Sequence, residues 1–452
     1  MAKKKQIELT IEEKLRNALV PKEEQPYKIP SNWCWSYWKY CGKFIAGNGF
    51  KNIYQGFTQY DIPYYKVGSL KFCDEGNYLI DETNTINEEI RTKLKAVKIP
   101  VNSIIFAKIG EAIKLNRRCL NKIECCIDNN LMAFISEKYF YKYIFYWTKS
   151  LNFYELTNAT TVPALRKTDL ENIPIPLPPL NEQQRIVNRI ESLFAKLDRA
   201  KELIENTLAQ FEQNKMAILH KAFTGELTAK WRKENNIDLS SWEKIKLGKV
   251  LLPMQTKKPT GQFFRYIDID AIDNKHQIVK APKLILTEKA PSRASRGVET
   301  GNILFSMVRP YLKNIAQIDS DLSDCIASTG FYVCRCKPEL NSRFLYYLFI
   351  FDKTIDYLMQ FMKGDNSPSI RKDDLLNMKI DLPTIEEQQE IVNILDNLLA
   401  KYNKIKNLEQ QLEKIELLKK AILAKAFRGE LGTNNPDEES AENLLKEILA
   451  EK

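Results

Sequence analysis

The chain has 452 residues, with 68 Lys and Arg against 58 Asp and Glu, which gives a formal net charge of +10. Its 44% hydrophobic and 28% charged residues are typical of globular proteins and exclude a disordered, collagen-like or rod-like chain. At roughly 150 residues per domain, the length predicts two or three domains and excludes a single small module. No apolar run approaches the roughly 18 residues of a membrane span, so we expect a soluble, cytoplasmic protein.

In chain order, the sequence predicts a globular region, a long helix, a second globular region and a second long helix. Runs of β-branched and aromatic residues predict strands at Ile62–Val67, Ile104–Ile109, Leu131–Ile135, Phe264–Ile269 and Phe331–Cys334. Phe140–Trp147 and Phe344–Phe351 are predicted as buried helices, so each region is mixed α/β. The expected segments are an N-terminal helical arm at 1–26, a globular domain at 27–180, a spacer helix at 181–224, a linker at 225–237, a second globular domain at 238–383, a second spacer helix at 384–428, and a tail with a short helix at 429–452.

The two halves of the chain repeat each other. Val162–Gln184 recurs as Ser367–Gln389 at a constant offset of 205, and both copies contain Pro-x-Leu/Ile-Arg-Lys-x-Asp-Leu and Glu-Gln-Gln. Lys221–Leu227 and Lys425–Leu431 share Lys-Ala-Phe-x-Gly-Glu-Leu at an offset of 204. The chain is therefore an internal duplication whose second copy is one residue shorter between these motifs.

Both spacer segments run without Pro or Gly, and their apolar residues alternate at spacings of four and three, with polar Thr207 and Asn214 interrupting the first. This pattern predicts coiled-coil helices that end at Gly225 and Gly429. A helix of about 42 residues spans roughly 60 Å, too long to be packed within one such domain. The economical arrangement buries the two helices against each other, and a two-fold relation between the halves would make them antiparallel and hold the two domains apart.

Each globular region carries basic, aromatic and small polar residues in its expected loops, and such side chains contact phosphates and base edges. The strongest candidates are the repeated pairs Arg166-Lys167 and Arg371-Lys372, because the same pair recurs at a helix start. The other predicted nucleic-acid contacts are Tyr65, Lys66, Lys108, Asn116, Arg117, Arg118, Thr160, Arg265, Tyr266, Arg293, Arg296, Arg309, Lys313, Asn314 and Asn366. For any single one of them, the alternative is a solvated surface residue, and Asp169 and Asp374 are interpreted as helix-start or packing residues.

No catalytic or nucleotide-binding motif accompanies these residues. The sequence has no Walker loop and no Asp/Asn-Pro-Pro-Tyr/Phe signature, and Gly47-Asn-Gly49 lacks a third glycine. The only histidines, His220 and His276, are interpreted as solvated surface residues. The nine cysteines lack a Cys-x-x-Cys pair, which favours reduced thiols over a zinc site. We therefore expect no catalysis, no metal and no cofactor in this chain.

Several segments resemble the specificity subunit of type I restriction-modification systems. They are Pro176–Val187, the long helix and Lys221–Leu227, the second copies at Leu382–Val392 and Lys425–Leu431, the opening Leu9–Trp33 and the acidic tail Asn435–Leu445. The resemblance implies two target-recognition domains, each binding one half of a bipartite, asymmetric sequence in double-stranded DNA. It also implies that the helices set the gap between the halves and dock two methyltransferase (M) subunits. The M subunits would use S-adenosylmethionine, and restriction (R) subunits, using ATP and magnesium, would complete the nuclease.

Two other functions stay open at this point. A coiled-coil assembly scaffold without DNA reading would leave the basic loops as solvated surface, and an autonomous nuclease or methyltransferase is disfavoured because its motif is absent.

The two spacers differ in length by one residue, which affects the expected symmetry. A one-residue deletion moves a helix end by about 1.5 Å and rotates it by about 100°, so the two-fold relation is not strict and the gap length is not fixed by the sequence.

Overall fold

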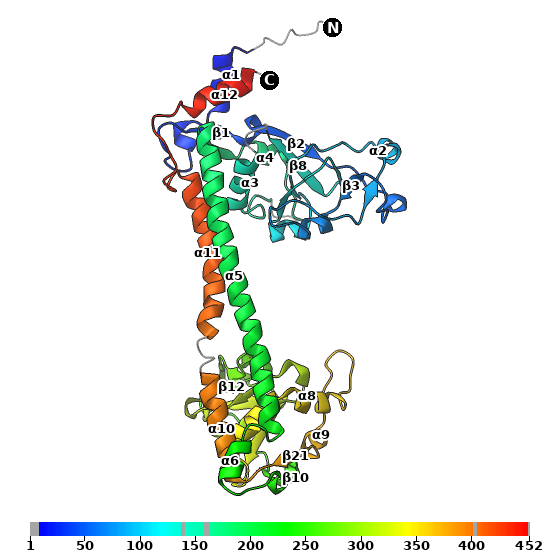
Figure 1. Ribbon diagram of the computed structural model, residues 1–452, viewed down its shortest axis with the longest axis vertical. Helices are drawn as coiled ribbons and strands as arrows, with labels where there is room; N and C mark the ends of the chain where they lie inside the picture. Colours follow the sequence, from blue (N-terminus) through cyan, green and yellow to red (C-terminus); the bar gives the residue numbers. More distant parts are fainter. Residues whose placement is uncertain (1–8, 137–140, 158–161, 401–404, 451–452) are drawn as a thin grey trace. The chain divides into compact units, whose positions relative to one another are not determined.

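The computed structural model describes residues 9–136, 141–157, 162–400 and 405–450, and its contacts divide the chain into two compact units. Unit 1 comprises Met1–Glu202 and Gln411–Lys452, and unit 2 comprises Leu203–Gln410. Each unit contains both helices and sheets (Figure 1), so the mixed α/β prediction is confirmed. The finer segment boundaries expected from the sequence stay predictions.

Unit 1 contains a four-stranded sheet, a three-stranded sheet and a two-stranded ribbon. The four-stranded sheet has the order β2 (Gly42–Ala46), β8 (Leu131–Ser136), β5 (Ile104–Ala107) and β6 (Arg118–Leu120). The three-stranded sheet has the order β4 (Thr85–Ile86), β3 (Ile62–Tyr65) and β7 (Cys126–Ile127), and β1 (Cys34–Tyr37) pairs with β9 (Pro174–Leu177). The helices of this unit are α1 (Ile11–Ala18), α2 (Glu88–Leu94), α3 (Tyr141–Ser150), α4 (Lys167–Glu171) and α12 (Ala441–Ala450).

Unit 2 repeats this plan with additional short strands. Its first four-stranded sheet has the order β11 (Leu251–Leu252), β20 (Phe331–Cys336), β17 (Ile303–Ser306) and β18 (Ile315–Gln317). Its second has the order β15 (Lys283–Leu286), β12 (Phe263–Ile267), β19 (Ile326–Ser328) and β16 (Ala294–Gly297). Two ribbons pair β10 (Glu243–Lys246) with β21 (Lys379–Leu382) and β13 (Ile272–Asp273) with β14 (Ile278–Val279). The shorter helices are α6 (Ala229–Glu234), α7 (Ser342–Ile350), α8 (Asp352–Met359) and α9 (Lys372–Leu376).

The sequence repeat is also a structural repeat. The ribbon register Cys34↔Leu177 in unit 1 recurs as Glu243↔Leu382 in unit 2, and β3–β7 and β12–β19 are the corresponding parallel pairs. Since side chains alternate between the faces of a strand, equal register puts equivalent residues on equivalent faces. Positions in these paired strands can therefore be compared residue by residue.

Aromatic side chains fill the core of unit 1. Trp38 is fully buried, and the centre of its ring lies 4.7 Å from that of Phe44 and 5.0 Å from those of Phe134 and Trp147. Six consecutive residues of α3 are buried, as are the last seven of α7, which explains why both segments are apolar all round. The predicted buried helices are confirmed within the described residues, and Phe140, where the first was expected to begin, lies outside them.

The first spacer is one continuous helix, α5 (Leu180–Phe223, 44 residues). The second is described as α10 (Ile385–Ala400) and α11 (Ile405–Phe427). Tyr402, which belongs to the apolar alternation of this spacer, lies outside the described residues. In unit 1, α5 and α11 lie side by side (Figure 1), with Lys201 3.5 Å from Glu416 and Lys419 5.4 Å from the Phe194 ring centre. Partners farther along α5 lie earlier in α11, so this pair is antiparallel.

Glycines in the left-handed region follow both long helices. Gly225 has φ +81° and Gly429 has φ +75°, a conformation that side chains with a Cβ rarely adopt. Among the described residues, no helix is long and apolar enough to cross a membrane. All nine cysteines are free thiols, and seven are buried.

Candidate nucleic-acid interface

The Pro-x-Leu-Arg-Lys loop of unit 1 is fixed to the end of an inner strand. The Gly110 amide donates to the Pro163 carbonyl, and the Leu165 amide donates to the Lys108 carbonyl, both at 2.8 Å. These bonds join the loop to the residues that follow β5. Both hydrogen bonds join backbone groups of the loop to backbone groups that follow β5. The position of the loop therefore does not depend on its exposed side chains.

The corresponding loop of unit 2 makes the same two contacts. The Arg309 amide donates to the Pro368 carbonyl at 2.8 Å, and the Ile370 amide donates to the Met307 carbonyl at 3.0 Å. Met307 and Arg309 follow β17, the strand equivalent to β5. The two repeated loops therefore occupy equivalent places in their units.

Each loop buries its aliphatic residues and exposes its basic pair. Leu165 and Ile370 are each 5% exposed, and the leucines of the short following helices, Leu170 and Leu375, are fully buried. The exposed basic residues are Arg166 and Lys167 in unit 1 and Arg371 and Lys372 in unit 2. The leucine of the motif's Asp-Leu pair thus anchors each loop, while Arg-Lys faces solvent.

Each basic pair has one acidic neighbour that contacts it. Asp374 accepts a hydrogen bond from the Arg371 amide at 2.7 Å, which supports its interpretation as a helix-start residue. Lys167 lies 3.5 Å from Glu171, an exposed pair that contributes little stability. The basic pairs are therefore available to an anionic partner.

Side chains next to the two loops differ. Lys108 in unit 1 is replaced at the equivalent position of unit 2 by Met307, and Gly110 is replaced by Arg309. The Arg309 guanidinium is exposed and donates to the Asn366 carbonyl at 2.7 Å. Thr160, which was predicted to lie in the first loop, falls outside the described residues.

Arg118 is a structural residue rather than a surface cation. It is 2% exposed, and its guanidinium donates to the carbonyls of Asn116 at 2.6 Å and Leu151 at 2.7 Å. The same group lies 3.9 Å from the centre of the Phe153 ring. Because Leu151 follows α3, Arg118 satisfies a carbonyl at the C-terminal end of that helix. Its prediction as a nucleic-acid contact is corrected to this role.

Asn116 and Lys313 perform the same task from the surface. The Asn116 amide group donates to the Leu151 carbonyl at 3.0 Å. In unit 2, the Lys313 ammonium donates to the Ile350 carbonyl, the last residue of α7, at 3.1 Å and also contacts Asp352. Both residues therefore hold a helix end in place, which is a structural contribution whether or not they also touch DNA.

Three further predicted contacts are buried in the structure. Tyr65 is 3% exposed, Tyr266 is 4% exposed and Asn314 is 6% exposed. Burial raises the pKa of Tyr65, as expected for a phenol removed from water. These side chains are withdrawn from the surface, so we no longer expect them to contact nucleic acid directly.

The remaining candidates lie at or near the surface. Arg117 and Arg293 are exposed, and Arg296 is half-buried. Lys66 is engaged by the Gln55 side chain at 2.7 Å, and Arg265 forms two hydrogen bonds with Asp324 through its Nε, at 3.1 and 3.2 Å. Arg265 must exchange this carboxylate for a phosphate if it is to bind DNA.

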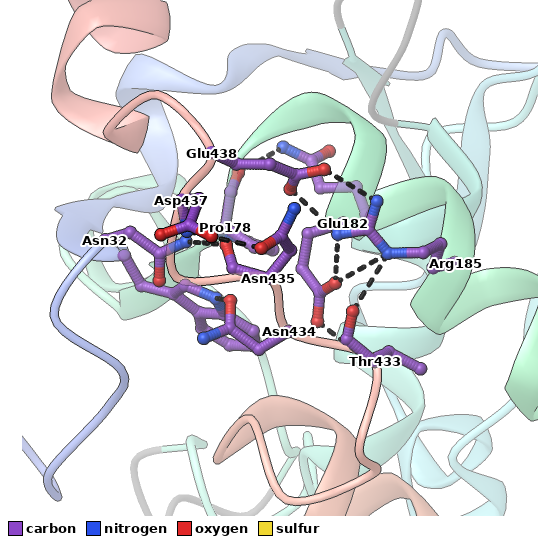
Figure 2. Close-up of polar contacts among 11 residues, drawn as sticks. Asn32, Pro178, Glu182, Arg185, Thr433, Asn434, Asn435, Asp437 and Glu438 are labelled. Atoms are coloured by element: carbon purple, nitrogen blue, oxygen red, sulfur yellow. Dashed lines mark hydrogen bonds and ion pairs between the residues drawn. The ribbon is translucent and has the colours of Figure 1, made fainter.

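The repeated Glu-Gln-Gln motif builds a junction that the sequence analysis did not identify. Glu182 at the start of α5 is fully buried and accepts a hydrogen bond from the Thr433 hydroxyl at 2.7 Å. Arg185 bridges Glu182 at 2.8 Å to both oxygens of Glu438 at 2.7 and 2.8 Å (Figure 2). Burial raises the pKa of Glu182, whereas the hydrogen bonds from Arg185 hold the pKa of Glu438 below its usual range. The tail is thereby tied to the helix start.

Unit 2 contains the equivalent junction at the start of α10. Glu387 is fully buried and accepts from the Thr228 hydroxyl at 2.7 Å and from the Trp242 indole at 2.9 Å. The Arg232 guanidinium contacts both Glu387 and the Gly225 carbonyl. Each unit therefore joins the start of one long helix to the segment that follows the end of another.

The neighbouring glutamines strengthen both junctions. Gln183 donates to the Pro178 carbonyl at 2.9 Å, and Gln388 donates to the Pro383 carbonyl at 2.8 Å. The signal for these residues was present in the sequence, because the polar Glu-Gln pair recurs in register at the start of both helices and is buried in both copies, whereas the third residue of the motif is exposed. We used the motif to mark the repeat and did not infer its buried contacts.

No metal or acid–base site stands out near these elements. Within the described ranges, no group of three or more His, Cys, Asp or Glu is arranged to hold a metal ion. His276 keeps 35% of its side chain exposed and lies between Asp273 at 2.9 Å and Glu409 at 3.3 Å, so it is a surface residue with two acidic neighbours.

Known proteins share this duplicated arrangement. A sequence model described as "Type I restriction modification DNA specificity domain" matches residues 52–210 and 242–417. The chain is similar to the EcoDI specificity subunit of Escherichia coli, with 28% identity over 342 residues that cover 68% of this chain and 76% of that protein. It is also similar to the MjaVIII specificity subunit of Methanocaldococcus jannaschii, with 27% identity, covering 62% of this chain and 67% of that protein.

Solved structures share the fold. One, from a study of complex assembly and conformational transition in the type I R-M system, aligns with a TM-score of 0.65 and 20% identity over 90% of this chain and all of that chain. The HsdS subunit of Thermoanaerobacter tengcongensis aligns with a TM-score of 0.50 and 21% identity over the same shares. The two family matches cover well over half of the chain and fall on its two repeats, which disfavours an assembly scaffold without DNA reading. The chain belongs to the family of type I restriction-modification DNA specificity subunits and carries two copies of the specificity domain.

Proposed function

We propose that each unit reads one half of a bipartite, asymmetric sequence in double-stranded DNA. In this proposal the long helices set the gap between the halves and dock two M subunits, and R subunits join the assembly in the cytoplasm. The chain itself supplies recognition and no catalysis, and it needs no cofactor of its own. The M subunits would use S-adenosylmethionine, and the R subunits would use ATP and magnesium.

One observation carries the proposal: the same backbone bonds hold an exposed Arg-Lys pair in each unit, while the side chains beside the pair differ. Contacts to phosphates position a protein on DNA, whereas contacts to base edges distinguish sequences. Arg166-Lys167 and Arg371-Lys372 suit the first task because they are the same in both units. The differing neighbours, Lys108 in one unit and Arg309 in the other, suit the second. Two different half-sites require this combination.

The long helices supply the expected docking surface for M subunits. Leu417 and Leu418 of α11 are 63% and 50% exposed, which is unusual for adjacent large apolar residues on one helix. Burial against a partner would remove this apolar surface from water. The second spacer is one residue shorter than the first between the repeated motifs, so the two spacers cannot be related by a strict two-fold axis.

The test is strand-resolved mapping of adenine methylation in host DNA before and after deletion of the gene. We expect one bipartite, asymmetric motif to disappear from the methylation pattern. An unchanged pattern in cells that express an active M subunit would contradict the proposal.

DNA binding by the assembled complex separates recognition from simple assembly. If about 6 to 10 phosphates are contacted, log K should fall with log salt at a slope of roughly −5 to −9. A slope near zero would contradict DNA recognition and favour an assembly scaffold without DNA reading.

A further inference from the structure

Unit 2 has an open groove, lined by both apolar and polar side chains, that the proposed DNA contacts do not use. Its volume is about 600 Å³, and its lining includes Phe223, Trp242, Phe351 and Ile380. The rings of Phe223 and Phe351 are stacked with their centres 5.3 Å apart and form its apolar floor. Leu239 at its edge is 44% exposed. Leu239 therefore leaves apolar surface accessible at the edge of the groove in the chain alone.

Unit 1 covers the equivalent surface with its own N-terminal arm. The repeat makes Phe427 equivalent to Phe223, because both end the Lys-Ala-Phe motif, and the shared ribbon register makes Trp35 equivalent to Lys244. The Tyr27 hydroxyl donates to the Phe427 carbonyl at 3.1 Å, and its ring packs edge-on against Trp35 with centres 4.9 Å apart.

Two more contacts fix the arm in place. The Trp35 indole donates to the Tyr27 carbonyl at 3.2 Å, and the Arg428 guanidinium lies 5.4 Å from the centre of the Tyr27 ring. Arg428 is equivalent to Thr224, another residue that lines the groove of unit 2. Every residue that Tyr27 contacts here thus has a counterpart in the lining of the open groove.

The chain cannot fill the groove of unit 2 in the same way. The residues before Trp242 form helix α6, which is held down by the buried contact of Arg232 with Glu387. The segment then passes through Leu239 at the groove's edge and enters β10. No residue of this segment takes the place that Tyr27 takes in unit 1.

The charges at the rim indicate what kind of segment would fit. Lys244, Lys353 and Lys379 line the groove and are exposed. None of the three makes a hydrogen bond or ion pair among the described residues, and Asp381 is the one acidic residue in the lining. The rim therefore favours an acidic occupant, whereas the equivalent arm of unit 1 contains both Lys and Glu.

We propose that this groove binds an extended, acidic segment of a partner protein that inserts an aromatic side chain where unit 1 inserts Tyr27. The aromatic ring lies beside Lys244 and Thr224 with its edge at the Phe223 carbonyl, and its acidic neighbours pair with the lysines of the rim. We expect the segment to come from an M subunit, and in this one respect the inference rests on the proposed function. The groove and its lysines do not take part in the proposed DNA contacts.

The first test uses a fluorescent peptide with the sequence of residues 19–30, in which the changes Lys22→Glu and Lys28→Glu make it acidic. We expect saturable binding to the full-length chain by fluorescence anisotropy, and loss of binding when Tyr27 of the peptide is changed to alanine. The chain variant Lys353→Glu/Lys379→Glu should weaken binding by roughly tenfold or more, because it reverses two rim charges. The matched control, Lys280→Glu/Lys289→Glu, changes two exposed lysines of unit 2 outside the groove and should bind normally. Absence of binding, or equal loss in both double variants, would overturn the proposal.

The second test identifies the natural occupant. A photo-crosslinking residue at position 353 of the full-length chain is activated in the complex with purified M subunit, and the crosslinked peptide is sequenced by mass spectrometry. A crosslink to an acidic segment of the M subunit with an aromatic residue supports the proposal. A crosslink to the N-terminal arm of a second copy of this chain, or no crosslink in a complex that methylates DNA, overturns it. DNA binding measured on the same complex reports the proposed function separately.

Discussion

Replacing Arg232 by methionine should destabilise unit 2 strongly, although Arg232 lies away from the proposed DNA contacts. The guanidinium is the only cation paired with Glu387 among the described residues, and the two side chains are 8% and 0% exposed. Methionine preserves much of the side-chain volume but leaves the carboxylate buried without a counter-charge. The change therefore isolates the electrostatic contribution of the Arg232–Glu387 ion pair to the stability of unit 2.

The expected loss follows from the contacts that remain. Removing one partner of a buried ion pair costs about 3–5 kcal/mol. Thr228 and Trp242 still donate to Glu387 at 2.7 and 2.9 Å, which places the loss near the lower limit, about 3 kcal/mol. The bond from Arg232 to the Gly225 carbonyl is lost as well and adds about 1 kcal/mol. We expect a total of about 3–4 kcal/mol.

A double variant tests the cause. With Glu387→Gln added to Arg232→Met, neither charge of the pair remains buried. The double variant should therefore lose less free energy of unfolding than the sum of the two single losses, by about 2 kcal/mol or more. Native-state hydrogen exchange of the full-length chain would measure the opening free energy of α6 and the start of α10. Lys233→Met, an exposed neighbour, is the matched control and should change stability by less than about 0.5 kcal/mol. A loss below about 1 kcal/mol in Arg232→Met, or strict additivity in the double variant, would refute the reasoning.

Three other perturbations follow from the repeat. Changing Arg371 and Lys372 to alanine should weaken DNA binding by the assembled methyltransferase across sequences, by about 1–3 kcal/mol, and unchanged affinity in a titration would remove these residues from the interface. Exchanging residues 238–383 for the equivalent domain of a relative should alter one half of the methylated motif and leave the other unchanged in a methylation map. Gly225→Ala should cost more than Gly432→Ala in thermal unfolding. Both have positive φ, which costs about 1–2 kcal/mol with a Cβ, but only at Gly225 would the Cβ meet a side-chain carbon at 2.5 Å; equal losses would contradict this.

The sequence was sufficient for the features that depend on local periodicity and repetition. The constant offset of 205 between the copies reappears as the shared ribbon register Cys34↔Leu177 and Glu243↔Leu382. The long apolar alternation became the 44-residue helix α5, and the apolar segments became the buried helices α3 and α7. These features could be predicted because the hydrophobic periodicity of a helix or strand is visible in consecutive residues of the sequence.

Only the tertiary structure decided which polar residues face solvent. Arg117 and Arg118 are adjacent and chemically identical, yet one is exposed and the other is buried, because Arg118 reaches a carbonyl 33 residues away. Glu182 likewise finds its hydroxyl partner 251 residues along the chain. The open groove of unit 2 exists because the arm that covers the equivalent surface of unit 1 has no counterpart there. Burial and pairing of this kind arise between segments far apart in sequence, where local pattern carries no information about contact.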